Sequence, residues 1–363
     1  MKVAIDTRWT NFPQTGVGNY IVNLLKAIVK IKNSSEFVLF GNSVPGIPVK
    51  TIKISGFKKK LIQGLWKTVG FPSLESLTGK VDLVHFTNGT AAPTKLPYVL
   101  TVFDLSYLYY PETIEPKNLN FLKRFVPASL EKAVKIIAIS TATKNDLVKF
   151  FGQSLVQKTE VIPLGVEELF FQPCLEDRWP QLTKKFKIRE PYLLTVSTLE
   201  PRKNLSFLIQ VYRQISKLKE IQLVIVGQTG WGIIPAEIVD SEPGKVVLTG
   251  FVTKEELHQL YSHAEIFLFP SLYEGFGLPV LEAAAAKLPV VASNVGALPE
   301  VAGKAGILLP VNEKSVWFKT ILNLLDNPQQ RERMSQLGPI QAKKFSWDKT
   351  ARKTVEVYYK GTF

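Results

Sequence analysis

The sequence predicts an α/β protein made of two doubly wound, Rossmann-like parallel-sheet domains. The chain has 363 residues, which is long for one ordinary domain and sufficient for two separate cores. Short β-branched runs alternate with helical patterns, and this rhythm starts afresh after a polar, proline-containing connector at about 166–191. The strand runs are apolar without alternation, which is typical of parallel strands that are buried on both faces.

The predicted strands fall into two groups that flank the connector. Before it they are 2–6, 36–41, 82–86, 98–104, 135–140 and 159–164. After it they are 192–198, 222–227, 246–251, 265–271 and 289–294. Because open parallel sheets bind ligands beyond the carboxyl ends of their strands, we expect the two domains to face a central cleft.

The domain boundaries follow from these groups. We expect an N-terminal domain over residues 1–168 and a C-terminal domain over residues 169–345. The last helical stretch, which follows Trp347, has an apolar pattern suited to packing against another element. Residues 346–363 are therefore expected to return to the N-terminal domain and complete it.

Composition narrows the classes of function. The hydrophobic content of 45% and the charged content of 21% are those of a globular protein. The single Cys174 and three scattered histidines, His85, His258 and His263, do not predict a metal site. No apolar stretch is long enough to cross a bilayer, and Asp6 and Arg8 stand where a signal peptide would be apolar. We therefore expect a cytoplasmic protein.

The net charge of +14 indicates an anionic partner, which could be a nucleic acid, an acidic membrane surface or a phosphorylated small molecule. The sequence has no recognition helix, zinc finger or stacking-sheet signature, so nucleic acid is not expected.

The strongest motif runs from Tyr273 to Glu282, after the strand predicted to end at Ser271. Pro279 and a run of four alanines predict a helix that starts close to Leu278, with Glu282 in its first turn. Glycines on both sides of Phe276 would let the backbone approach an anion or a sugar hydroxyl at the helix start. The alternative is a glycine-rich turn in which the carboxylates are solvated or complement the helix dipole.

Two further motifs follow the first strand of each domain. Arg202 and Lys203 stand in the segment LEPRKN, where two cations suit a diphosphate and would stabilise the charge that develops as a nucleoside diphosphate departs. The alternative is a solvated basic turn. Gly16 and Gly18 stand in TGVGNY, which matches a dinucleotide fingerprint only in part because Ile21 occupies its third glycine position. A nicotinamide cofactor is not expected, and a structural turn remains the alternative.

Together these motifs resemble retaining glycosyltransferase family 4, whose members have the two-domain GT-B fold. The spacing from Glu274 to Glu282 is similar to the E-x7-E element of that family. Other similar segments occur in the family's order: TGVGNY, VDLVHFTN, IIAISTATKNDL, VIPLGV, STLEPRKNL, LVIVG, LTGFV and SLYEGFGLPVLEAAAAKLPVVAS. The resemblance covers nearly the whole chain.

The resemblance implies residue roles. Glu274 would contact the donor sugar, Glu282 the ribose hydroxyls, and Arg202 and Lys203 the diphosphate. The other residues implied on the donor side are Gly16, Gly18, Gly227, Thr249, Gly250, Phe251, Val252, Gly275, Phe276, Gly277 and Leu278. No metal is implied, since the sequence lacks the Asp-x-Asp pair used by the other common fold of sugar transferases.

The chain departs from the family at two places. Many members have a histidine where this chain has Phe103, which is followed by Asp104. Asp104 or His85 could take over sugar or acceptor contacts, and a structural role is the alternative for both. Ser197 or Thr198 stands where other members place a further arginine.

The implied activity is metal-independent, retaining transfer of a hexose from a nucleoside-diphosphate sugar to a sugar or lipid-linked oligosaccharide during polysaccharide biosynthesis. A UDP-glucose type of donor is favoured, with GDP-mannose next, and no cofactor is implied. The alternatives are a nucleotide-sugar epimerase or hydrolase of the same fold and a non-catalytic nucleotide-sugar sensor, which Phe103 favours.

The segment 57–67 interleaves lysines with apolar and aromatic residues at helical spacing. It predicts a helix that could bind an anionic membrane and hold the protein at the inner face of the plasma membrane. The alternative is a helix whose apolar side packs within its own domain.

Overall fold

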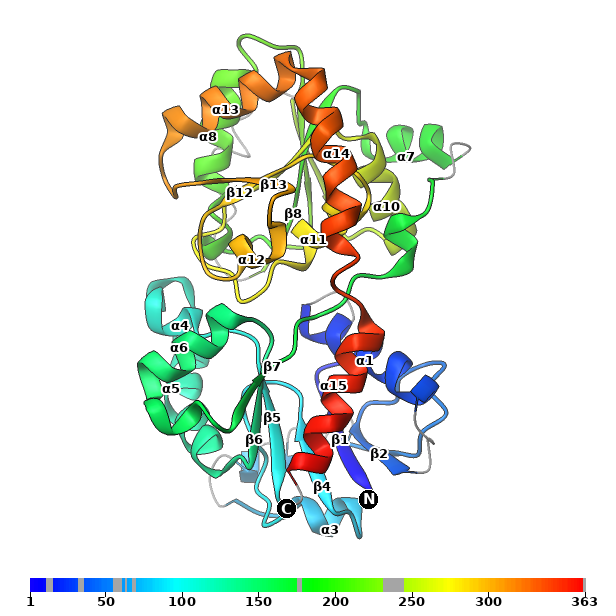
Figure 1. Ribbon diagram of the computed structural model, residues 1–363, viewed down its shortest axis with the longest axis vertical. Coiled ribbons are helices and arrows are strands. Elements are labelled where there is room, and N and C mark those ends of the chain that lie inside the picture. The colour runs from blue at the N-terminus through cyan, green and yellow to red at the C-terminus, as the bar shows by residue number, and fades with distance from the viewer. Residues whose placement is uncertain are drawn as a thin grey trace. The chain divides into compact units, whose positions relative to one another are not determined.

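The computed structural model describes residues 1–10, 16–31, 36–54, 61–62, 64–66, 70–174, 178–230 and 245–361. The chain forms two compact units. Unit 1 comprises Met1–Leu105, Pro116–Gly165 and Ser346–Phe363, and unit 2 comprises Ser106–Glu115 and Val166–Phe345. Each unit is built around one parallel sheet (Figure 1), so the predicted fold class is confirmed.

Unit 1 contains a seven-stranded sheet in the order β3-β2-β1-β4-β5-β6-β7. The strands are β1 (Val3–Thr7), β2 (Phe37–Gly41), β3 (Thr51–Lys53), β4 (Leu83–Phe86), β5 (Tyr98–Val102), β6 (Lys135–Ala138) and β7 (Thr159–Val161). All their pairings are parallel. The chain moves outward from β1 in one direction and then returns to β4 on its other side. The point where the strand order reverses therefore lies between β1 and β4, where parallel sheets commonly bind ligands.

The helices of unit 1 follow the apolar periodicity of the sequence. They are α1 (Gly16–Ile31), α3 (Leu74–Thr78), α5 (Pro116–Lys132), α6 (Thr141–Phe151) and α15 (Trp347–Lys360), with a 3-10 turn η3 (Gln153–Leu155). Helix α1 buries Ile21, Leu24 and Ile28. Helix α15, at the end of the chain, packs against α1 within this unit (Figure 1). Residues far apart in sequence thus share one core.

Unit 2 contains a six-stranded sheet in the order β10-β9-β8-β11-β12-β13. The strands are β8 (Tyr192–Val196), β9 (Gln222–Val226), β10 (Val246–Gly250), β11 (Ile266–Phe269), β12 (Val290–Ser293) and β13 (Gly306–Leu309). Every pairing is parallel. Here the strand order reverses between β8 and β11.

Unit 2 also contains helices, several of which pack against the sheet or against one another. The helices are α4 (Ser106–Tyr109), α7 (Trp179–Phe186), α8 (Leu205–Ile215), α10 (Lys254–His263), α11 (Leu278–Ala285), α12 (Leu298–Ala302), α13 (Lys314–Asp326) and α14 (Pro328–Ala342). The 3-10 turns are η2 (Pro111–Thr113), η4 (Glu168–Phe171) and η6 (Pro201–Lys203). One core cluster joins Leu208 of α8, Ile225 of β9, Leu268 of β11 and Trp317 of α13.

The strand predictions are confirmed, except that two of the four edge strands were missed and several strands end earlier than predicted. The edge strands β3 and β13 were not predicted. Strand β5 ends at Val102 and β8 ends at Val196, before the predicted ends. Phe103 and Asp104 therefore follow β5, and Ser197 follows β8. This difference moves all three residues from strands into the loops at the carboxyl edges of the sheets.

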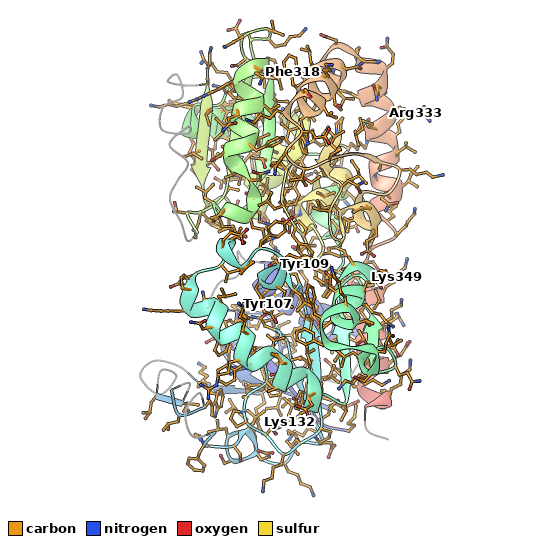
Figure 2. All side chains as sticks on the ribbon, turned by 90° about the vertical axis from the view of Figure 1, so that its left-hand side faces the viewer. Tyr107, Tyr109, Lys132, Phe318, Arg333 and Lys349 are labelled. Carbon is orange, nitrogen blue, oxygen red and sulfur yellow. The ribbon has the colours of Figure 1, made fainter. Side chains whose placement is uncertain are left out.

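Part of the positive charge lies on exposed helix surfaces. Figure 2 labels Lys132 on α5, Arg333 on α14 and Lys349 on α15, and all three side chains are exposed. Of the segment predicted to bind a membrane, residues 57–60, 63 and 67 lie outside the described residues. Among the helices that the structure describes, none has the length and apolar character needed to span a bilayer.

Candidate functional site

The two strongest sequence motifs meet at the carboxyl edge of the unit 2 sheet. The segment that contains Arg202 and Lys203 follows β8, and the segment that contains Glu274 follows β11. These strands are neighbours and parallel, so their carboxyl ends lie side by side. A hydrogen bond from the Leu272 backbone N–H to the Arg202 carbonyl, at 2.9 Å, ties the two segments together. The point of strand reversal therefore carries the candidate site.

Two cations and two carboxylates form an ion cluster at this edge, comprising Glu200, Arg202, Lys203 and Glu274. Lys203 Nζ lies 2.6 Å from Glu274 Oε1, and Arg202 Nη1 lies 3.2 Å from Glu274 Oε2. Arg202 Nη2 also lies 2.7 Å from Glu200 Oε1. The side chains of both cations are 13% exposed, so the cluster is largely shielded from water. Coulomb interactions are stronger in such surroundings than at an open surface.

The pKa of Glu274 shows which effect dominates in the ion cluster. Burial alone would raise the pKa of this carboxyl group. The adjacent charges of Lys203 and Arg202 outweigh burial and lower the pKa from 4.5 to about 2. Glu274 is therefore an anion at any physiological pH and can accept hydrogen bonds but cannot donate one.

Backbone contacts fix the loop around Glu274. Arg202 Nη1 donates to the Tyr273 carbonyl at 2.6 Å, and the Ala297 N–H donates to the Glu274 carbonyl at 2.9 Å. The Tyr273 ring stacks on Tyr109 of α4, with ring centroids 5.3 Å apart (Tyr109 is labelled in Figure 2). The two hydrogen bonds hold the backbone of the loop, and the ring stacking holds the Tyr273 side chain. The Glu274 side chain is thereby placed against the cations.

The glycine-rich loop leads directly into α11. Gly277 precedes the helix with a φ of 103°, a left-handed conformation that side chains rarely adopt. The helix begins at Leu278 as predicted, with Pro279 as its second residue. Gly275 and Phe276 are buried in the same loop. The predicted elements are therefore present at the helix start.

Glu282 lies in the second turn of α11, so its prediction for the first turn was wrong. The helix has no acidic residue in its first turn, and the dipole explanation for Glu282 loses its basis. Tyr261 Oη donates a hydrogen bond to Glu282 Oε2 at 3.1 Å. Burial raises the pKa of Glu282 to about 7, the Tyr261 hydrogen bond opposes that shift, and the charge of Glu167 adds to it.

The segments predicted to contact the base lie together at the carboxyl ends of β9 and β10. The Gly227 N–H donates to the Gly250 carbonyl at 3.0 Å. Gly227 has a φ of 146°, and a Cβ atom there would lie 1.9 Å from the Ser197 carbonyl oxygen, so a side chain does not fit. Thr249 is partly exposed, Val252 is buried and Phe251 is 47% exposed. The backbone of this region therefore approaches the Ser197 segment closely.

The other predicted residues lie in unit 1. Gly16 and Gly18 form the first turn of α1, Gly16 exposed and Gly18 buried. Phe103 and Asp104 follow β5 and are partly exposed. The Phe103 carbonyl accepts a hydrogen bond from Thr143 Oγ1 at 3.0 Å, and its ring meets Tyr20 edge to face. The structure brings these residues to the carboxyl side of the unit 1 sheet.

His85 is held in the core of unit 1, which favours its structural alternative. Its Nδ1 lies 2.7 Å from the Tyr358 hydroxyl and its Nε2 lies 2.8 Å from Thr101 Oγ1. The side chain has no exposed surface, and burial lowers its pKa to about 3. His85 is therefore a neutral imidazole whose two nitrogens already have partners, so it is not positioned for a sugar.

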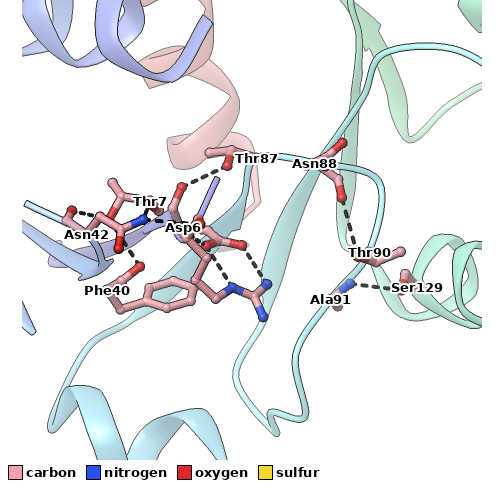
Figure 3. Close-up of polar contacts among 10 residues, drawn as sticks. Asp6, Thr7, Phe40, Asn42, Thr87, Asn88, Thr90, Ala91 and Ser129 are labelled. Carbon is pink, nitrogen blue, oxygen red and sulfur yellow. Dashed lines mark hydrogen bonds and ion pairs between the residues drawn. The ribbon is translucent and has the colours of Figure 1, made fainter. Parts of the chain in front are cut away.

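A second buried charge pair lies at the end of β1 and was not identified in the sequence as a pair. Arg8 Nε lies 2.9 Å and Nη2 2.6 Å from the two carboxylate oxygens of Asp6, and Figure 3 shows this region. Thr87 Oγ1, at the end of β4, donates to the Asp6 carbonyl at 2.7 Å (Figure 3). The Arg8 guanidinium also lies 5.0 Å from the Trp66 ring, and Trp66 is buried. Trp66 thus contributes to packing within the unit.

Sequence reasoning missed Glu200 and Tyr261. Glu200 stands within the LEPRKN segment, and its two-residue spacing from Arg202 was the available signal. Tyr261 lies 21 positions before Glu282 on another helix, and nothing in the local sequence links the two residues. Within the described ranges, no three His, Cys, Asp or Glu side chains are grouped so as to hold a metal ion. Metal independence stays a prediction.

Comparisons with known proteins identify glycosyltransferases as the relatives of this chain. Residues 15–168 match the family described as Glycosyltransferase Family 4, and residues 179–340 match Glycosyl transferases group 1. The chain is similar to O-antigen chain mannosyltransferase B of Escherichia coli, with 28% identity over 99% of both chains. It is also similar to an uncharacterized glycosyltransferase of Methanocaldococcus jannaschii, with 30% identity over 99% of this chain and 98% of the relative.

Among solved structures, sucrose-phosphate synthase from Thermosynechococcus elongatus is similar in fold, with a TM-score of 0.76 and 21% sequence identity. The match covers 99% of this chain and 98% of that chain. The strand orders, the two family matches and the relatives that span the full length lead to one conclusion. The chain belongs to the group 1 glycosyltransferases of the family 4 type, with the GT-B fold.

Proposed function

We propose that this glycosyltransferase moves a hexose, with retention of anomeric configuration, from a nucleoside-diphosphate sugar to a sugar or lipid-linked oligosaccharide during polysaccharide biosynthesis. The observation that carries the proposal is the ion cluster at the carboxyl edge of the unit 2 sheet. Two adjacent cations on one strand-end segment face an ionised carboxylate on the next. Such a set can hold a diphosphate and a sugar hydroxyl at the same time.

The two cations would contribute most to catalysis while the bond between the sugar and the diphosphate breaks. Negative charge grows on the departing diphosphate, and fixed cations that water does not screen stabilise this charge in the transition state. Arg202 is fixed by Glu200 and by the Tyr273 carbonyl, so its guanidinium is oriented in advance. This chemistry needs no metal ion, and we propose a metal-independent reaction.

The carboxylates would hold the donor at two places. Glu274 remains ionised and can accept hydrogen bonds from sugar hydroxyls. Glu282 lies eight positions later, in the second turn of α11, and is the candidate for the ribose hydroxyls. A retaining reaction on one face of the sugar lets the departing phosphate accept the proton of the acceptor. The proposal therefore assigns no protein base, and the absence of a histidine at Phe103 is compatible with activity.

The donor sugar that we propose is mannose. From the sequence alone we expected a UDP-glucose type of donor, with GDP-mannose next. The full-length relative from Escherichia coli is an O-antigen chain mannosyltransferase, which supports mannose instead. GDP-mannose is therefore the first donor to test and UDP-glucose the second.

The acceptor side rests on unit 1. Asp104 and Phe103 at the end of β5 are the residues of this unit that we propose for sugar or acceptor contacts. If the acceptor is lipid-linked, the enzyme would work at the inner face of the plasma membrane, where the exposed lysines and arginines suit an anionic surface. Flotation with anionic liposomes tests this location, and a protein that stays unbound contradicts it.

The experiment for the activity is a donor screen with purified protein, using GDP-mannose, UDP-glucose and ADP-glucose with lipid-linked oligosaccharide acceptors. We expect acceptor-dependent release of a nucleoside diphosphate, unchanged by EDTA. The one-bond carbon–proton coupling at the anomeric centre of the product should show the same configuration as the donor. A sensor would bind a donor without releasing nucleotide, and a hydrolase would release nucleotide without acceptor. Either outcome contradicts the proposal.

A further inference from the structure

The charges of the ion cluster balance one another. Glu200 and Glu274 carry two negative charges, and Arg202 and Lys203 carry two positive charges. A diphosphate that approaches this cluster meets cations whose charge is already neutralised by carboxylates. Binding therefore requires an exchange of partners and not only the addition of an anion.

The two cations are held in different ways. Arg202 is bound by Glu200, two positions before it in the same segment, and by the Tyr273 carbonyl. Lys203 Nζ makes its hydrogen bond to Glu274 and lies over the Phe269 ring. Arg202 would keep two partners if Glu274 were to release it, whereas Lys203 would have to find a new anion. Glu274 is thus the partner that both cations share.

We propose that Glu274 and the diphosphate of the donor compete for Lys203 and for Nη1 of Arg202. When the donor binds, its phosphates take these cations, Glu200 keeps Arg202 in place, and the released Glu274 turns its oxygens to the hydroxyls of the donor sugar. This inference rests on the proposed function. Glu200 is then a positioning residue for Arg202. Glu274 both contacts the donor sugar and competes with the diphosphate for the two cations.

The exchange has a consequence for the product. A donor that carries its sugar supplies hydroxyl donors to Glu274, which offset the loss of its cations. A nucleoside diphosphate without sugar supplies none, so it leaves a buried carboxylate without its cations. An unpaired buried charge is costly, and Glu274 recovers its cations most readily when the product departs. Glu274 thus favours the donor over the spent nucleotide and assists product release.

Calorimetric titration of GDP, GDP-mannose, UDP and UDP-glucose into wild-type protein and Glu274→Gln tests this competition. Glutamine keeps the shape of the side chain and removes its charge. We expect the variant to bind the nucleoside diphosphates about tenfold tighter or more, which is about 1.4 kcal/mol. The sugar-bearing donors should gain less, because they also lose their contact with the carboxylate.

The matched control is Glu255→Gln, because Glu255 is an exposed carboxylate in the first turn of α10 and its loss changes the net charge equally. It should change every affinity less than twofold. The inference is overturned if Glu274→Gln binds GDP and UDP no tighter than wild type while its thermal unfolding is unaltered. If neither protein binds any of the four nucleotides, the proposed function itself is contradicted.

A second measurement uses the unaltered protein, so it does not depend on how a variant folds. In a crystal structure with the bound nucleoside diphosphate, Lys203 Nζ should lie on a phosphate oxygen and more than about 4 Å from Glu274. Arg202 Nη2 should stay on Glu200. A Lys203–Glu274 pair that remains at its present 2.6 Å beside the bound diphosphate overturns the exchange.

Discussion

The Asp6–Arg8 pair of unit 1 and the Lys203–Glu274 pair of unit 2 join buried charges at the carboxyl edges of the two sheets in opposite ways. In unit 1, Asp6 and Arg8 are two residues apart at the end of one strand, and their pairing is local and bidentate. In unit 2, Lys203 and Glu274 are 71 positions apart and belong to loops that follow different strands. A local pair has a fixed partner, whereas loops on neighbouring strands can exchange partners. We infer that the first pair is structural and the second serves a ligand.

The largest expected effect is a loss of stability caused by a change in unit 1. Arg8→Met leaves the fully buried Asp6 without its cation, which should cost about 3–5 kcal/mol of unfolding free energy. Urea unfolding followed by far-UV circular dichroism measures this loss. The double variant Asp6→Asn with Arg8→Met is the control, and it should recover most of the loss. A single variant as stable as wild type would show that the pair is not structural.

The second largest expected effect is a loss of transfer activity caused by a change in unit 2. Glu274→Ala removes the carboxylate proposed to meet the donor sugar, and transfer should fall by about 10²–10³-fold, as when one stabilising group is removed from an active site. Nucleoside diphosphates should still bind, because both cations remain. Steady-state release of nucleotide measures the rate, and Glu255→Gln serves as the control with wild-type activity. A rate within threefold of wild type contradicts the role.

A third effect concerns pH and sharpens the contrast between Glu274 and Glu282, whose pKa values shift in opposite directions. The folded-state pKa of Glu282 is raised from 4.5 to about 7, so the folded protein favours the protonated form. The associated stability is present below pH 4.5 and is lost as pH rises to 7. Relative to Glu282→Gln, wild type should lose about 3 kcal/mol over that interval. Urea titrations across the interval test this, and a constant difference contradicts it.

The smallest effect tests whether His85 is structural. Tyr358→Phe removes the hydroxyl that bonds to His85 Nδ1, and the loss of one hydrogen bond should cost about 1 kcal/mol. Transfer activity should be unchanged. The same urea unfolding and nucleotide-release assays measure both quantities. A loss of activity with intact stability would contradict the structural role and would support a contact of His85 with the acceptor.

Much of the fold could be predicted because buried parallel strands have a strong local signal. Strands such as β1, β8 and β11 are continuous apolar runs that follow directly from the sequence. The edge strands β3 and β13 were missed because they are short and only partly buried, so their sequences lack that signal. Strand ends were predicted too late where an apolar residue such as Phe103 continues past the last ladder bond.

The site was predictable as a set of residues but not as a set of contacts. Strand-end position and residue type identified Arg202, Lys203 and Glu274. The contact of both cations with Glu274 depends on which loops the sheet order brings together, and this lies outside any local pattern. Glu200 was overlooked although Arg202, the cation that it binds, lies only two positions away. The local sequence also placed Glu282 one turn too early, since the start of α11 at Leu278 puts it in the second turn.

Calorimetric titration of GDP and UDP into wild type, Lys203→Met and Arg8→Met tests the central claim most directly. Both variants lose one cation at a sheet edge, but only Lys203 belongs to the ion cluster. We predict that Lys203→Met weakens nucleotide binding by about tenfold or more, which is about 1.4 kcal/mol, and that folded Arg8→Met binds as wild type does. Equal binding by wild type and Lys203→Met, or a loss confined to Arg8→Met, would contradict the assignment of the nucleotide site to unit 2.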